Sequence, residues 1–335
     1  MTTSRDAQLK LERATERLAA AGAARANAEG ANNTCGVTTR AARRWRADHA
    51  PAGSLPGPGS TRAARSNRVP APDAARLDSR PVPSFSPPHA PPEHAVSHLR
   101  ERGYVVLSPR GLARLVDATE GALDRLAPHW DELPEDAHLR DGGRYRRRRH
   151  GSFVFDGGEL RPVPHRPHWQ PVDYNALHGG IERWFEPLPG DLVASEDWRT
   201  LLAGLTGQAA ALRGHDGPWF IEAHLFRIDT AGGIGRPTPE GAHRDGVDMV
   251  AVVLLDRAGI KGGETRVFDA AGPNGQRFTM AERGTALLLD DERTVHETTP
   301  IQPSTGAAGH RDTLVVTWRR GGFQDPGAGA PGEVR

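Results

Sequence analysis

The sequence predicts a mainly β fold, a closed or sandwiched antiparallel sheet of the jelly-roll type with flanking helices. Short strand-like runs, separated by Gly, Pro, Asn and Asp, follow one another between residues 219 and 318. No helix-length segment separates them, so the crossover helices that a parallel sheet requires are missing. The predicted strands are 219–228, 249–255, 264–269, 276–280, 285–289, 295–299 and 313–318.

Helices are expected ahead of these strands. Apolar residues recur at helical spacing between residues 111 and 126, which predicts one continuous helix there, and a second helix is predicted around 197–212. Ordered structure is expected to begin near Ala95, where apolar residues become frequent. We therefore expect one domain at 93–322.

The regions outside this domain have the composition of disordered tails, at 1–92 and at 323–335. Between Pro51 and Pro92 lie 11 of the 28 prolines, mixed with Ser, Gly, Ala and Arg, a composition that buries too little apolar area to offset chain entropy. Residues 1–90 hold 14 basic and 7 acidic side chains, which leaves 29 basic and 35 acidic side chains for the remainder. The balanced total charge thus joins a basic tail to an acidic domain.

Composition also excludes several classes of protein. No apolar run approaches the roughly 18 residues that span a bilayer, and the N-terminus carries no apolar signal segment. The single cysteine, Cys35, excludes an intramolecular disulfide and a multi-cysteine zinc site. We expect a cytoplasmic protein without a membrane partner. The acidic domain argues against a nucleic-acid partner, and the sequence leaves the oligomeric state open.

A metal-binding pattern lies within the strand-rich region. His243 and Asp245 are two residues apart, so on an extended segment both side chains point to the same side, just before the strand predicted at 249–255. His296 lies within a later predicted strand. Two imidazoles and one carboxylate on one face of a metal leave positions open, as suits non-haem Fe(II) oxygen chemistry.

The His-x-Asp pattern alone is weak evidence, because it also occurs at 129–131 and 310–312. The pair at 129–131 precedes every strand, and the pair at 310–312 has no later histidine to complete a triad. A kinase interpretation of His-Arg-Asp fails, because no Asp-Phe-Gly follows. His243 and His296 taken singly would be ordinary hydrogen-bonded histidines.

Arg311 shifts the balance towards function. It opens the last predicted strand, and Thr313 shares its face of that strand. A guanidinium with an adjacent hydroxyl suits the distal carboxylate of a dicarboxylate ligand, and a 2-oxo acid that chelates iron needs such an anchor. The alternative for an arginine at a strand start is a solvated edge charge.

Taken together, the segments 241–248, 288–300 and 311–313 resemble the Fe(II)/2-oxoglutarate-dependent dioxygenases. The similarity, which covers about residues 96–320, is to the bacterial branch that includes L-isoleucine hydroxylases acting on free amino acids, with further matching signals at 175–183 and 221–224. It implies a double-stranded β-helix (jelly roll, cupin-like) core. It also implies Fe(II) bound by the catalytic residues His243, Asp245 and His296, and 2-oxoglutarate bound by Arg311 with Thr313.

The substrate site is predicted around the mouth of the metal site. In the strand at 219–228 Glu222 and His224 share a face, and Glu222 could pair with a substrate ammonium, although an outward polar face is the competing interpretation. Arg146, from a dense arginine run, could hold a substrate carboxylate, and Tyr174 belongs to a segment that could cover the site. His168, next to Pro167, is expected to be a solvated loop histidine.

The predicted activity is hydroxylation of a small polar substrate that uses Fe(II), 2-oxoglutarate and O2, with succinate and CO2 as co-products and ascorbate as reductant in vitro. A free L-amino acid is the leading substrate. The alternatives are a hydroxylase of a peptide or secondary metabolite, and a non-catalytic metal-binding jelly-roll protein. The complete triad with Arg311 favours an enzyme, because a non-catalytic descendant has no reason to keep an oxo-acid anchor.

Overall fold

The computed structural model describes residues 85–119, 121–175 and 177–326. The predicted tails lie outside these ranges up to residue 84 and from residue 327 onward. Part of the predicted N-terminal tail packs against the domain. Ala90 is buried, and its N–H donates to the Val106 carbonyl at 2.8 Å.

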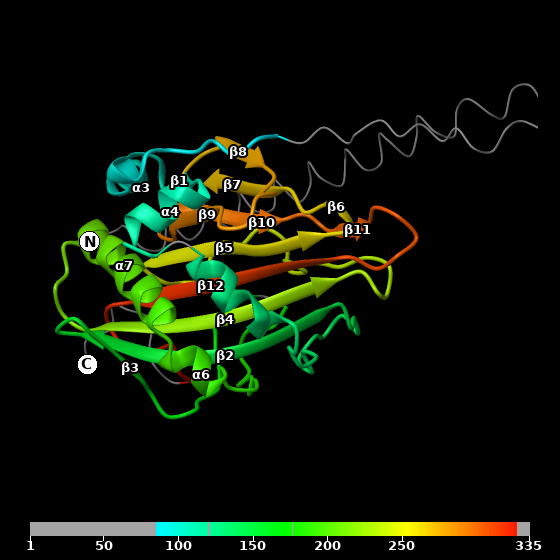
Figure 1. Cartoon of the computed structure of the whole chain (residues 1–335), viewed down its shortest axis with the longest axis horizontal. Coiled ribbons are helices and arrows are strands. Elements are labelled where there is room, and N and C mark those ends of the chain that lie inside the picture. The colour runs from blue at the N-terminus through cyan, green and yellow to red at the C-terminus, as the bar shows by residue number, and fades with distance from the viewer. Residues whose placement is uncertain (1–84, 120, 176, 327–335) are drawn as a thin grey trace, which may run out of the picture. The chain divides into compact units, whose positions relative to one another are not determined.

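Antiparallel β-sheets form the framework of the described domain (Figure 1). The large sheet has seven strands in the order β1-β9-β5-β12-β4-β2-β3, the second has the order β10-β7-β8, and β11 pairs with β6. The strands are β1 (Tyr104–Leu107), β2 (Arg146–Asp156), β3 (Glu159–Pro162), β4 (Trp219–Asp229), β5 (Met249–Ala258), β6 (Ile260–Gly262), β7 (Thr265–Asp269), β8 (Gly275–Phe278), β9 (Ala286–Asp290), β10 (Thr294–Thr298), β11 (Ile301–Pro303) and β12 (His310–Arg319).

Helices flank the large sheet. They are η1 (Pro92–His94), α3 (Ala95–Arg102), α4 (Pro109–Leu115), α5 (Ala122–Leu126), η2 (Ala127–Trp130), α6 (Gly190–Ala194) and α7 (Glu196–Arg213). Helix α7 lies across one face of that sheet (Figure 1). The Ser195 hydroxyl caps its first turn by accepting from the Trp198 N–H at 3.3 Å, and Gly214 ends it in the left-handed conformation at φ 59°. Within the described ranges, no helix is long and apolar enough to cross a membrane.

Strict alternation in the central strands separates the core from the functional site. In β4, Ile221, Ala223 and Leu225 pack with α7 in the main hydrophobic cluster, whereas Glu222 and His224 face the opposite way into a cavity. The same alternation continues on β12 and β2, which flank β4. One face of the large sheet is therefore apolar and covered by helices. The opposite face is polar over β4, β12 and β2, where it lines the cavity, and apolar over β1, β9 and β5, where it packs against β7 and β8 in a second hydrophobic cluster.

The predicted strands agree with β4, β5, β7, β8, β9, β10 and β12 to within a few residues, and the helix predicted at 197–212 is α7. The continuous helix predicted at 111–126 is wrong, because the chain breaks into α4 and α5 there. Asp117 adopts a positive φ of 55° and Gly121 precedes α5 at φ 74°. Apolar residues continue at helical spacing through this break, so the sequence pattern did not indicate that the helix ends there.

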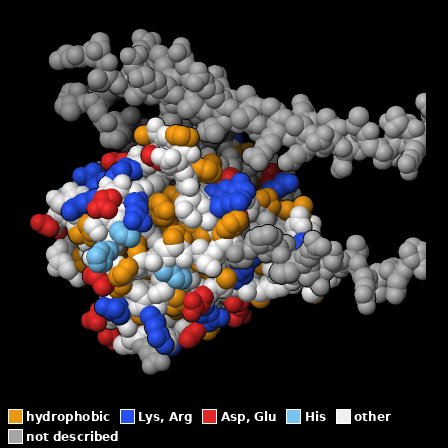
Figure 2. All heavy atoms as spheres, turned by 90° about the horizontal axis from the view of Figure 1, so that it is seen from above, with side chains coloured by type: hydrophobic (Ala, Val, Ile, Leu, Met, Phe, Trp, Pro, Cys, Tyr) orange, Lys and Arg blue, Asp and Glu red, His pale blue; other side chains and the backbone are white. Residues whose placement is uncertain are grey.

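The surface charge of the described part is mixed. Figure 2 shows a face on which basic and acidic side chains alternate with apolar patches, without a region where one sign prevails. A continuous basic stripe, the usual electrostatic signature of nucleic-acid binding, is not visible on that face.

Candidate active site

The polar face of the large sheet and the segment before β5 enclose a cavity of about 130 Å³. His243, Asp245 and His296 line it from the side of the smaller sheet, and Arg311 and Thr313 of β12 line it from the large sheet. All five residues that sequence motifs single out for metal and oxo-acid binding thus meet in one cavity.

His243, Asp245 and His296 place one donor atom each within 4.8 Å of one another. The His243 Nε2 atom is 3.7 Å from Asp245 Oδ1, and His296 Nε2 is 3.9 Å from Asp245 Oδ2. Two ligands bound to one ion at about 2.1 Å each can be no more than about 4.2 Å apart, so both separations are compatible with a shared ion. The backbones of His243 and His296 also pair, with N···O distances of 3.0 and 2.9 Å.

Hydrogen bonding and charge suit these residues to a cation. His243 Nδ1 lies 3.0 Å from the Gly241 carbonyl, which can only accept, so the proton is on Nδ1 and the Nε2 lone pair is free. Burial above all lowers the pKa of His296 to about 3, so this imidazole is neutral. Burial raises the pKa of the Asp245 carboxyl, and a divalent cation would relieve that burial of negative charge.

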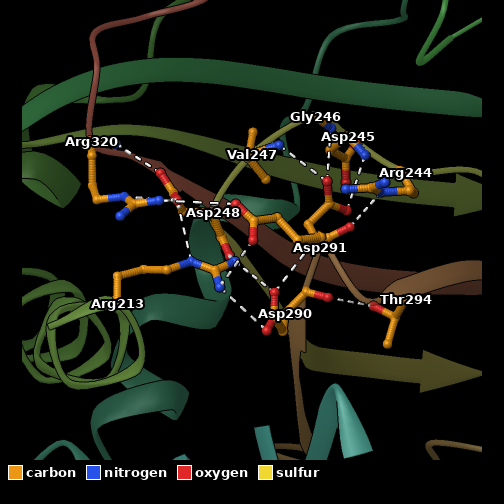
Figure 3. Close-up of polar contacts among 11 residues, drawn as sticks. Arg213, Arg244, Asp245, Gly246, Val247, Asp248, Asp290, Asp291, Thr294 and Arg320 are labelled. Atoms are coloured by element: carbon orange, nitrogen blue, oxygen red, sulfur yellow. Dashed lines mark hydrogen bonds and ion pairs between the residues drawn. The ribbon is translucent and has the colours of Figure 1, made fainter. Parts of the chain in front are cut away.

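Asp291 fixes the loop that carries Asp245 (Figure 3). Its buried carboxylate accepts the backbone N–H groups of Asp245, Gly246 and Val247 at 3.1, 2.8 and 3.1 Å. Gly246 has a φ of 73°, so the chain turns tightly enough for consecutive N–H groups to converge on one carboxylate. Asp291 also lies close along the chain to His296, and it therefore ties two of the triad residues to one corner of the fold.

Asp290 holds the neighbouring part of the same corner. Its carboxylate accepts from the Arg213 guanidinium of α7 at 2.6 Å, and Arg213 also donates to the Asp248 carbonyl at 2.6 Å. The Asp248 carboxylate in turn accepts from the backbone N–H and the Nε of Arg320, at 2.9 and 3.0 Å (Figure 3). The segment 245–248 is thus held at both ends by buried or half-buried ionic groups.

Arg311 is a buried cation with unused donors. It is 3% exposed, and its Nε and Nη2 atoms have no hydrogen-bond partner among the described residues. Burial, and then the nearby Arg257, lower the pKa of its guanidinium to about 10. Thr313 faces the same cavity two residues along β12. A buried, unsatisfied guanidinium is costly unless an anion completes it, so this end of the cavity suits a carboxylate.

Comparison with known proteins agrees with this donor set. Residues 127–317, more than half of the chain, match the family model described as 2OG-Fe dioxygenase. This chain belongs to the 2OG-Fe dioxygenase family. It is therefore an oxidoreductase, and the enzymes of this family use Fe(II), 2-oxoglutarate and O2. The double-stranded β-helix core expected from the sequence is confirmed.

Solved structures give the same fold. A bsmA homolog from Methylobium petroleophilum PM1 is 54% identical with a TM-score of 0.68, over 71% of this chain and 96% of that one. IDO from Bacillus thuringiensis is 16% identical with a TM-score of 0.57, over 69% and 96% of the two chains. The Fe(II)/(alpha)ketoglutarate-dependent dioxygenase TqaL is 19% identical with a TM-score of 0.52, over 68% and 87%. No curated protein matches the chain.

Of the four residues predicted to bind substrate, three line the cavity and one does not. Arg146 lines the dioxygenase cavity, and its Nε donates to Asp136 at 2.7 Å while Nη2 has no partner among the described residues. Glu222 and His224 also line the cavity, so they do not form an outward polar face. Tyr174 does not line it, and its ring packs over Gly246, where a Cβ atom would lie 2.5 Å from the ring.

One carboxylate oxygen of Glu222 is already engaged by histidines. Its Oε1 atom is 3.0 Å from His150 Nε2 and 3.3 Å from His168 Nδ1, and these histidines hold its pKa below the ordinary range although burial opposes this. His168 is buried, so the expectation of a solvated histidine is wrong: the antiparallel bridge from His168 to Arg183 draws it inward.

His150, His168 and His224 also bring three donor atoms together, but they do not form a suitable second metal site. Arg148 Nη2 is 2.7 Å from His224 Nδ1, and because a guanidinium can only donate, this ring nitrogen already uses its lone pair. A cation there would also face the buried charge of Arg148. We assign the cluster to hydrogen bonding of Glu222 within the cavity wall.

Further residues of the cavity come from outside the metal and oxo-acid motifs. Glu240, which no sequence motif indicated, lines it with an unpartnered Oε2 atom, and Gln170 and Arg183 line it from the irregular segment between β3 and α6. Arg148 lines it beside Arg146, because alternate residues of β2 share a face. The irregular segment has no periodicity, so nothing in its local sequence indicates which side chains face inward.

Proposed function

We propose that the protein hydroxylates a small polar substrate, with a free L-amino acid as the leading candidate, and forms succinate and CO2 as co-products. The observation that carries this proposal is the buried, unsatisfied guanidinium of Arg311 in the same cavity as His243, Asp245 and His296. A metal-binding protein without turnover has no use for such a group, because Arg311 cannot coordinate a cation.

The proposed roles follow from the contacts. His243 and His296 would bind Fe(II) through Nε2 and Asp245 through a carboxylate oxygen, and Arg311 with Thr313 would bind the distal carboxylate of 2-oxoglutarate. When bound, Fe(II) with 2-oxoglutarate and O2 supplies the oxidising chemistry that inserts one oxygen atom into a C–H bond. Val252 and Val315 line the same cavity and would present an apolar surface to the reacting groups.

Charges in the remaining part of the cavity support a zwitterionic substrate. Arg146 Nη2 and Arg183 Nε are buried donors without a partner in the described part of the chain, and Glu240 Oε2 is an acceptor in the same state. A carboxylate bound by the arginines and an ammonium bound by Glu240 would satisfy both kinds of group. Glu240 is therefore a candidate partner of a substrate ammonium beside Glu222, which lines the same cavity.

The decisive experiment supplies anaerobically Fe(II)-loaded protein with 2-oxoglutarate, ascorbate and a pool of free amino acids, then admits O2 and measures succinate and product masses. We expect substrate-dependent succinate and a product heavier by one oxygen atom. A His243→Ala variant is the matched control. Succinate that never exceeds this control refutes the enzymatic proposal.

A second arm with short peptides and a third with secondary metabolites separate the substrate classes. A heavier product that appears in one of those arms and not with amino acids refutes the free amino acid as substrate and leaves the hydroxylase activity in place.

A further inference from the structure

Gln170 contacts the proposed iron ligand Asp245. Its Nε2 donates to Asp245 Oδ1 at 3.1 Å; this oxygen also lies 3.7 Å from His243 Nε2, and the other carboxylate oxygen, Oδ2, lies 3.9 Å from His296 Nε2. Gln170 is 6% exposed and lines the cavity, so water does not compete freely for this hydrogen bond. The hydrogen bond from Gln170 therefore acts on one of the two carboxylate oxygens, Oδ1.

The orientation of the Gln170 amide is determined by its neighbours. Its Oε1 atom accepts from Arg183 Nη2 at 2.8 Å and from Asn175 Nδ2 at 3.1 Å. Both partners are donors, so the reversed amide would place N–H groups against N–H groups. The Nε2 side must therefore face Asp245, whose Oδ1 atom accepts its hydrogen bond.

The covering segment that carries Gln170, residues 168–183, is closed on itself by backbone hydrogen bonds. His168 and Arg183 exchange two such bonds at 2.9 and 3.0 Å, and the Gly180 N–H donates to the Gln170 carbonyl at 2.8 Å. Asn175 Oδ1 accepts the His178 N–H at 2.7 Å within the same segment. The loop that carries Gln170 is consequently held by its own hydrogen bonds, which restrict the position of this side chain.

Charge reinforces the contact. Arg183 is buried, and its pKa is lowered to about 10 by burial and then by Arg146, yet it has no carboxylate within ion-pair distance in the described ranges. The Gln170 amide thus bridges the buried guanidinium of Arg183 to the Asp245 carboxylate.

We propose that Gln170, fixed by Arg183 and Asn175, is a positioning residue that holds the Asp245 carboxylate in one orientation, so that it binds the metal through a single oxygen. This inference rests on the proposed function. An iron site that must accept a 2-oxo acid and O2 needs three positions besides its three protein ligands. If Asp245 bound with both oxygens it would take one of them, and the hydrogen bond from Gln170 to Oδ1 opposes that. The covering segment thereby keeps a place for 2-oxoglutarate.

The test is a Gln170→Met variant, which keeps the length of the side chain and removes the donor. Mn(II) affinity is measured by titration of free Mn(II), and 2-oxoglutarate affinity is measured by calorimetry on Mn(II)-loaded protein without O2. We expect the Mn(II) affinity to stay within about threefold, because Asp245 can still bind the metal, and the 2-oxoglutarate affinity to fall about tenfold or more, because the second Asp245 oxygen would then occupy one of the open metal positions. Gln302→Ala, at an exposed position on β11, is the control and should change neither.

Opposite results would overturn the inference. An equal loss of Mn(II) and 2-oxoglutarate affinity would make Gln170 a general structural residue, and unchanged affinity for both would deny it any role. If the Met variant does not fold, Gln170→Asn, which is one methylene too short to keep both contacts, is measured in the same way. Wild-type protein that fails to bind 2-oxoglutarate with Mn(II) present would instead refute the proposed function.

Discussion

Replacement of Arg311 by methionine should stabilise the metal-free protein and abolish its binding of 2-oxoglutarate. The guanidinium is buried with two donor atoms that lack partners in the described part of the chain. Burial lowers its pKa to about 10, so the fold disfavours the charged form by about 3 kcal/mol. Methionine fills a similar volume without a charge, so we expect a gain of about 1–3 kcal/mol in the free energy of unfolding.

The same substitution should weaken 2-oxoglutarate binding more than a hundredfold, since a buried, hydrogen-bonded charge pair contributes about 3 kcal/mol or more. Urea unfolding of the metal-free protein measures the first effect, and calorimetry on Mn(II)-loaded protein without O2 measures the second. Arg144→Met, at an exposed arginine paired with Glu135, is the matched control and should alter neither quantity. An Arg311→Met protein that is less stable than wild type, or that binds 2-oxoglutarate within tenfold of wild type, would refute this reasoning.

Three further predictions concern the metal loop, the buried histidines and the metal. Asp291→Asn places an N–H donor among three backbone N–H groups. We expect the free energy of unfolding in urea to fall by about 2–4 kcal/mol and the Mn(II) affinity to fall about tenfold or more. Unchanged Mn(II) affinity would contradict the role of Asp291. Burial lowers the pKa of His168 to about 3. The free energy of unfolding should therefore be highest above pH 6.5 and should fall towards pH 3 by about 1.4 kcal/mol per pH unit from this group. A His168→Gln protein whose free energy of unfolding falls as steeply as that of wild type between pH 6.5 and 5 would contradict this prediction. Chelation should abolish succinate formation, and Fe(II) should restore it to wild type but not to His243→Ala, whose recovery would exclude His243 as a ligand.

The sequence was sufficient for the fold class and for the residues that sit at strand ends. Spacing of two along an extended segment predicted that His243 and Asp245 face the same side, and the same period predicted that Arg311 and Thr313 share a face; the structure brings all four into one cavity. These inferences need only the geometry of a strand, which is local and regular.

Contacts set by irregular backbone could not be predicted in this way. The tight turn at Asp117 interrupts an apolar period that otherwise continues, and the inward position of His168 results from its bridge to Arg183, 15 residues later. Glu222 was correctly placed beside the cavity, but its pairing with His150 depends on the register of β2 against β4. Such pairings are tertiary, and a local pattern contains no information about them.

Asp290 and Asp291 are adjacent at the end of β9, yet their carboxylates serve different layers of the molecule (Figure 3). The Asp290 carboxylate accepts from Arg213 at the last turn of α7, and the Asp291 carboxylate accepts from the backbone of the loop that carries Asp245. This arrangement links the outer helix to the candidate active site: a small rotation of α7 would be transmitted through the single peptide unit between Asp290 and Asp291 to the proposed metal ligand Asp245. Variants selected for altered turnover should therefore include changes in α7 that never touch a substrate, and swapping this helix between related enzymes would carry a cost in iron retention.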